Sequence, residues 1–193
     1  MYLCRSFLFL LLMVSFPVVA DWTLVPANSS LGFVSIKKGS VAEIHHFNHL
    51  SGNIDSQRRF RLDVDLNSVA TNIPVRDERM RKVLFETDHY PLASVVGILP
   101  DASYEHHQPG SAADAVVNAE LTLHGQSQMI EARLIVVGIG TDRILVVTRD
   151  PVIVDTAAFG LAQGVERLRQ IAKLPSIAKG VPVTFALVFK RTP

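Results

Sequence analysis

The chain has 193 residues, 48% of them hydrophobic, and its 19 lysines and arginines nearly balance 18 aspartates and glutamates. This balance excludes the strong net charge by which a protein attracts nucleic acid or an anionic surface over long distances. Cys4 is the single cysteine, so the chain cannot form an internal disulfide.

The first twenty residues have the features of an export signal. Arg5 is their one charged residue, and an apolar run extends from Phe7 to Phe16. Pro17 ends this run before it reaches the roughly 20 residues of a membrane span, and Val18–Ala20 offers small or β-branched residues for cleavage. We therefore expect residues 1–20 to be a cleaved signal peptide. The mature protein, residues 21–193, would be a single cysteine-free domain with no net charge, located in the periplasm or secreted.

Strand signals dominate the first half of the mature chain. Apolar and polar residues alternate without interruption at 60–67, which predicts a strand with one buried and one exposed face. Before it, strands are expected at Trp22–Val25, Ser30–Lys37 and Glu43–Ile54. A helix is expected next, over Pro74–Phe85, because Pro74 suits a first helical position and Met80, Val83 and Leu84 share one face.

The second half contains a further helix among strands. Strands are expected at Leu92–Leu99, at 117–124 and at 130–134, the last two forming a hairpin that turns near His124 and Gly125. A loop at 101–114, which contains His106 and His107, precedes this hairpin. Next come a strand at Arg143–Val154, an amphipathic helix at 164–174 that Pro175 ends, and a strand at Val181–Lys190.

Together these elements predict a mainly β protein, an eight-stranded antiparallel barrel with two short helical insertions. The interior of a barrel of about eight strands either is filled by side chains or holds one slender ligand. Several strands are apolar on both faces, which favours a lined cavity but leaves a fully packed interior open.

Candidate catalytic groups are few. His45, His46 and His49 could bind a metal, but residues 45 and 49 of an extended strand lie about 13 Å apart. Asp63 and Asp65 lie on the exposed face of a predicted strand, and neither a Gly-x-Ser-x-Gly motif nor a phosphate-binding loop is present. The basic residues of the first helix, Arg76 and Arg79 among them, could meet an anionic head group or simply face solvent.

The chain resembles the YceI-like family of exported bacterial proteins that bind lipids or polyisoprenoids. The resemblance begins with Asp21–Leu24 and is most specific over Val64–Ile73, which leads into Arg76–Met80. It continues through Leu121–Gly125 and Ala158–Leu161. The chain departs from the family pattern at Ala42–Ile44, where the family more often has Gly-x-Phe.

This resemblance implies a lipocalin-like barrel with an apolar tunnel for an isoprenoid tail, such as that of a quinone or a polyprenyl compound. The protein would bind and carry its ligand without catalysis or cofactor, and a homodimer is compatible with the sequence. Two alternatives stay open: a metal-dependent enzyme using His45, His46, His49 and His124, and a packed stress or interaction protein. The expected ligand-binding residues are Phe33, Phe47, Arg76, Arg79, Met80, Leu84, Phe85 and Phe159.

Overall fold

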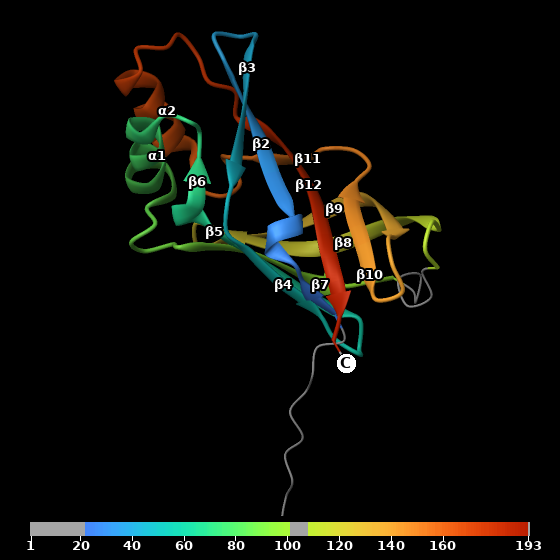
Figure 1. Cartoon of the computed structure of the whole chain (residues 1–193). Coiled ribbons are helices and arrows are strands. Elements are labelled where there is room, and N and C mark those ends of the chain that lie inside the picture. The colour runs from blue at the N-terminus through green and yellow to red at the C-terminus, as the bar shows by residue number, and fades with distance from the viewer. Residues whose placement is uncertain (1–21, 101–107, 193) are drawn as a thin grey trace, which may run out of the picture.

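The expected antiparallel barrel is present in the computed structural model, which describes residues 22–100 and 108–192 (Figure 1). The proposed signal peptide lies outside the described residues. Within them, a ring closes because Trp22 pairs with Ile54 on one side and with Arg191 on the other. The ring runs, in spatial order, through β1 (Trp22–Leu24), β4 (Leu50–Ile54), β5 (Arg59–Asp65), β7 (Leu92–Ile98), β8 (Ala112–Leu123), β9 (Gln126–Gly138), β10 (Arg143–Thr148) and β12 (Gly180–Arg191).

Four further strands extend the wall beyond the ring. β2 (Ser30–Lys37) pairs with β12, and β3 (Val41–Phe47) pairs with β2. The short β6 (Val69–Ala70) pairs with β3, and β11 (Val152–Asp155) pairs with β12. These strands lie toward the end of the molecule where the helices are found (Figure 1).

The strand predicted at Glu43–Ile54 is two strands, β3 and β4, separated by Asn48 and His49. The backbone N–H of Asn48 donates to the carbonyl oxygen of Ser68 at 3.2 Å, and that of His49 donates to Ser68 Oγ at 3.0 Å. These bonds replace ladder pairs, so the chain bends here. As a result β3 pairs with β2, whereas β4 pairs with β1 and β5.

The strand predicted at Arg143–Val154 is also divided, into β10 and β11. Pro151 lies in the gap and has no backbone N–H with which to continue a ladder. The expected hairpin of β8 and β9 is confirmed. His124 and Gly125 form its turn with positive φ angles of 52° and 73°, as a two-residue turn of this kind requires.

Two helical segments lie together at one end of the barrel (Figure 1). The first begins at Pro74 as predicted and is α-helical over α1 (Pro74–Arg79), then π-helical over η3 (Met80–Phe85). The second, α2 (Ala162–Ile171), is shifted relative to the expected 164–174. Among the described residues, no helix combines the length and apolar character needed to cross a membrane.

Candidate ligand-binding cavity

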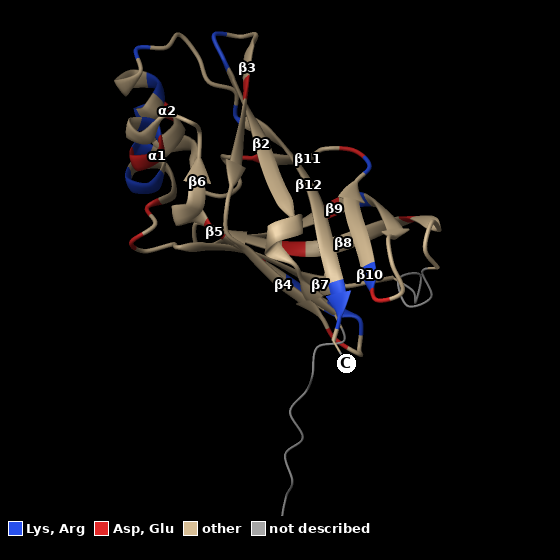
Figure 2. Ribbon diagram, viewed as in Figure 1, with Lys and Arg blue, Asp and Glu red and all other residues tan. Residues whose placement is uncertain are grey.

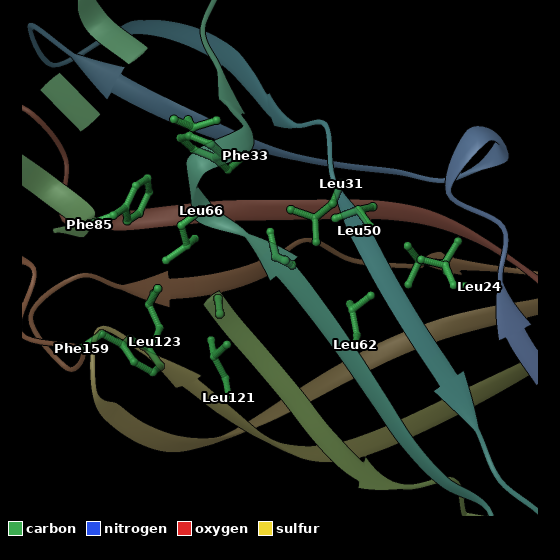
Figure 3. Close-up of a cluster of buried hydrophobic side chains, with 14 of the residues drawn as sticks. Leu24, Leu31, Phe33, Leu50, Leu62, Leu66, Phe85, Leu121, Leu123 and Phe159 are labelled. Atoms are coloured by element: carbon green, nitrogen blue, oxygen red, sulfur yellow. The ribbon is translucent and has the colours of Figure 1, made fainter. Parts of the chain in front are cut away.

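The barrel encloses a cavity of about 240 Å³ that is lined almost wholly by apolar side chains. Every ring strand except β1 contributes to the wall, and so do β2, β3 and β11. Apart from Arg61, the lining residues in the strands follow the two-residue strand period, because alternate side chains of each strand face the interior. Figure 3 shows Leu31, Leu62 and Leu121, from three different strands, directed into this interior.

Small side chains on the wall explain why the interior is not filled. Ala93, Ala115, Ala119 and Ala132 all line the cavity, at positions where larger residues would occupy the space. Protein interiors are normally close-packed, so four inward alanines around one space leave room for a ligand. The structure therefore differs from the fully packed interior that the sequence left open.

The helices complete the wall at one end of the cavity. Leu84 and Phe85 of η3 line it, and so does Leu161 directly before α2. The two helical segments approach closely at Gly164, where an added Cβ would lie 2.9 Å from the carbonyl oxygen of Val83. Glycine at this position is what allows the second helix to pack directly against the backbone of the first.

Three phenylalanines form a continuous aromatic group on the wall. The ring centroids of Phe33 and Phe47 are 5.4 Å apart, and those of Phe47 and Phe85 are 5.8 Å apart. Such tilted contacts at 4.5–7 Å are favourable aromatic geometry. The group joins β2, β3 and η3, and thereby connects the barrel to its helical end.

The structure brings four of the eight expected ligand-binding residues together on the wall: Phe33, Phe47, Leu84 and Phe85. Met80 and Phe159 are buried in the surrounding core but are not part of the wall. Neither arginine lines the cavity. Arg76 donates to Glu43 Oε2 at 2.7 Å and to the carbonyl oxygen of Thr71 at 2.6 Å, and Arg79 is exposed.

A polar cluster adjoins the aromatic group on the same face of β2 and β3. His45 is only 2% exposed, its ring centroid lies 5.2 Å from that of Phe33, and its Nε2 is 2.8 Å from Ser35 Oγ. Burial, together with the nearby Arg76 guanidinium, lowers the pKa of His45 below its ordinary value, so the neutral imidazole is favoured. Hydrogen bonds and charge from Lys37 and Arg76 lower the pKa of Glu43.

The predicted histidine group is divided by the fold. His45 faces the interior, whereas His46 is exposed and His49 lies in the bend after β3. His49 Nδ1 is 3.5 Å from Asp65 Oδ2, and His124 Nε2 is 2.8 Å from Glu86 Oε2. Across residues 22–100 and 108–192, no group of three or more His, Cys, Asp or Glu residues is arranged to hold a metal ion.

Many wall residues were not singled out from the sequence, although alternation could have found them. Examples are Val117 and Ala119 in β8 and Ala132 in β9, all of which alternate with exposed residues. The residues predicted to bind the ligand are all large side chains, most of them aromatic or helical. The strand residues that shape the cavity are ordinary members of a period-2 pattern.

These features define a β-barrel protein with an apolar internal cavity, a class suited to binding lipids. The chain belongs to the YceI-like family, since the family model for the YceI-like domain matches residues 22–189. No curated protein is significantly similar to the chain.

Solved structures agree with this assignment. A polyisoprenoid binding domain from Saccharophagus degradans, implicated in plant cell wall breakdown, is 37% identical; the match covers 90% of this chain and 100% of that one, with a TM-score of 0.87. BcnA from Burkholderia cenocepacia is 18% identical over 86% and 98% of the two chains, with a TM-score of 0.66, and supports the fold alone. A mutant CJ YceI protein with a monobromobimane guest does likewise, at 13% identity over 77% and 85% of the chains and a TM-score of 0.58.

Proposed function

We propose that this protein binds an amphiphile with an isoprenoid tail, a quinone or a polyprenyl compound, and sequesters or carries it. The apolar cavity within the barrel is the observation that carries this proposal. Burial of each tail methylene contributes about 0.8 kcal/mol, so an apolar wall alone can supply substantial affinity. The 37% identity to a polyisoprenoid binding domain supports an isoprenoid tail in particular.

The aromatic group and the helical wall are where we place the tail. Phe33, Phe47, Leu84 and Phe85 come from β2, β3 and η3 and line one continuous space. Flat aromatic rings and branched leucines suit the methyl-bearing, unsaturated chain of an isoprenoid.

We infer that the ligand is bound without being transformed. Apart from Arg61 and Thr156, the described wall residues are aliphatic, aromatic or proline. The Arg61 guanidinium is held by Asp63 at 2.7 Å and by Ser94 at 3.0 Å. A wall of this composition provides apolar contacts for a hydrocarbon chain. It offers few groups that could stabilise the charges formed during a reaction.

The test of the proposal is native mass spectrometry of the protein purified under lipid-preserving conditions. We expect an adduct whose mass matches an isoprenoid lipid, and rebinding of solanesol or a long-chain ubiquinone after extraction. Empty protein in every preparation, together with no binding of either added ligand, would contradict the proposal.

Export is a separate part of the proposal. In an aqueous compartment between membranes, an isoprenoid tail needs a protein that shields it from water. The features of residues 1–20 agree with export into such a compartment. When the full chain is expressed in a Gram-negative bacterium, we expect periplasmic protein that begins near Asp21. Cytoplasmic protein that retains Phe7–Phe16 would count against export while leaving ligand binding untouched.

A further inference from the structure

Thr156 lies on the wall of the apolar cavity and has a buried hydroxyl. It is one of two polar residues among the described wall residues, and only 5% of it is exposed. Its Oγ1 atom is buried and has no hydrogen-bond partner. Buried hydroxyls are normally hydrogen-bonded, so an unpartnered one on the wall of an otherwise apolar cavity requires an explanation.

The backbone of Thr156 is held by hydrogen bonds, whereas its hydroxyl has none. Its N–H donates to the carbonyl oxygen of Lys179 at 3.0 Å, and its own carbonyl accepts from Leu161 at 2.9 Å. Because Oγ1 has no hydrogen bond to lose, a χ1 rotation that turned it toward a group in the cavity would break no existing hydrogen bond. The backbone bonds fix where this hydroxyl lies relative to the wall.

We infer that Thr156 Oγ1 hydrogen-bonds the polar group of the ligand, and that this group is an uncharged alcohol or carbonyl. This inference rests on the proposed function. A diphosphate at Thr156 would meet no free cation on the described wall: Arg61 is half exposed and held by Asp63 and Ser94, and Lys179 contacts Thr156 through its backbone without being part of the wall. A neutral group loses far less hydration on burial and needs only the one bond that the hydroxyl can make.

Three probes that share an isoprenoid chain test this inference: squalene, solanesol and solanesyl diphosphate. In the wild-type protein we expect solanesol to bind more tightly than its diphosphate. In Thr156→Val, which keeps the shape but removes the hydroxyl, we expect solanesol to bind about three- to tenfold more weakly, the effect of one lost hydrogen bond. Squalene binding should be unchanged, and Thr156→Ser should retain the solanesol affinity.

The outcomes separate the inference from the proposed function. If wild-type protein binds neither squalene nor solanesol, the isoprenoid proposal itself fails. If both bind but Thr156→Val affects neither, or if the diphosphate binds best, the isoprenoid proposal stands and the role of Thr156 is refuted. Urea unfolding of the ligand-free variants checks that any loss of binding does not come from loss of the fold.

A second, independent observation concerns charge at the helical end. Residues 74–85 and 162–179 contain eight lysines and arginines against three aspartates and glutamates, although the whole chain is nearly balanced. Figure 2 shows several basic residues, in blue, on the two helical segments labelled α1 and α2. In the described part of the chain, the basic side chains with neither a hydrogen bond nor an ion pair are Lys38, Arg79, Arg81, Arg143, Arg167, Lys173 and Lys179.

All of these except Arg143 belong to the helical end or to the β2–β3 turn beside it. The turn and the segment after α2 are joined, because the N–H of Lys38 donates to the carbonyl oxygen of Ser176 at 3.1 Å. Large apolar side chains are exposed on the same helices or directly before them: Ile73 is 44% exposed, Val75 51% and Ile171 44%. The same helical segments supply Leu84 and Phe85 to the cavity wall.

We also propose that the helical end docks onto an anionic lipid membrane. Unpaired cations attract anionic head groups, and exposed isoleucine and valine side chains can enter the interface. Docking here would place the helical wall of the cavity against the bilayer from which a lipid ligand is taken.

Vesicle co-sedimentation tests the docking surface without involving the cavity. We expect binding to vesicles of phosphatidylglycerol and phosphatidylethanolamine, little binding to phosphatidylcholine, and release at high salt. The double variant Arg79→Glu/Arg167→Glu should weaken binding at least tenfold, whereas Arg143→Glu, at the unpaired cation away from this end, should not. Equal binding to both vesicle types, or equal effects of the two variants, would overturn the proposal.

Discussion

His45 is a buried histidine beside the aromatic group of the cavity, and its surroundings make it sensitive to pH. Its ring is covered by Phe33 and hydrogen-bonded to Ser35. Arg76 and Lys37 lower its pKa, in addition to the effect of burial, while the carboxylates of Glu43 and Asp77 act in the opposite direction. The net effect is a folded-state pKa below the ordinary value of 6.5.

We predict that stability falls as the pH drops below about 6.5, because the unfolded chain then gains a proton at His45 that the folded protein does not. The loss should approach about 1.4 kcal/mol per pH unit from this one group and level off below the folded-state pKa. Urea unfolding at several pH values measures it. The variant His45→Gln should flatten this slope, whereas His46→Gln, on the exposed face of the same strand, should leave it unchanged.

Ala119 is a residue whose small size keeps the cavity open. It lies on the wall and is 3% exposed. We predict that Ala119→Phe retains the fold, because the new ring enters existing space, and that it lowers solanesol affinity at least tenfold by occupying the volume of the tail. Circular dichroism and ligand titration give the two readouts.

The matched control for this substitution is Val116→Phe, which adds a ring on the same strand at a side chain that is 50% exposed. It should change neither fold nor affinity. Loss of the folded signal in Ala119→Phe alone would indicate a rigid, packed interior, since overpacking destabilises a core by about 1–3 kcal/mol.

At the scale of elements, the pair formed by η3 and α2 is the helical wall of the cavity. The hydrogen-bond pattern of the first segment changes from α to π at Met80, and Met80, Leu84 and Phe85 are all buried. A π-helical turn alters which side chains share a face. This change directs two consecutive residues, Leu84 and Phe85, toward the cavity, and α2 packs behind them.

We predict that Gly164→Ala destabilises the protein by about 1–2 kcal/mol, although alanine ordinarily favours a helix over glycine by about 1 kcal/mol. The new Cβ would lie 2.9 Å from Val83 O and 3.0 Å from Leu84 Cα, both backbone atoms, so α2 would have to move outward. Thermal unfolding measures the loss, and weaker solanesol binding would accompany it. Gly140→Ala is the control, since its Cβ would have no neighbour closer than 3.7 Å.

At the scale of the whole molecule, the closed ring and its cavity link ligand binding to stability. A ligand that binds only the folded barrel stabilises it by about 2.7 kcal/mol at a concentration one hundred times its Kd. We predict that extraction of lipid lowers the midpoint of thermal unfolding and that added solanesol restores it. Ala119→Phe should show no such restoration, and an unchanged midpoint in the wild-type protein would contradict stable occupancy of the cavity.

Much of the fold follows from the sequence because strand alternation is a local property. The 60–67 pattern, the Ser30–Lys37 strand and the turn at His124 and Gly125 all depend on neighbouring residues. The breaks at Asn48–His49 and at Pro151 were missed. The first depends on bonds to Ser68 from a distant part of the chain, and the second was overlooked even though proline marks it.

The sequence by itself determined that the chain forms an antiparallel barrel with more apolar surface than a solvated sheet needs, and it identified four residues of the cavity wall. Only the tertiary structure decided which residues share the cavity, because alternation assigns a side chain to a face but cannot say which strands oppose it. The structure also separated Arg76, paired with Glu43, from the wall and brought Thr156 to it. The same holds for charge: a nearly neutral sum over the chain is compatible with a basic end, since the fold determines where the charges gather.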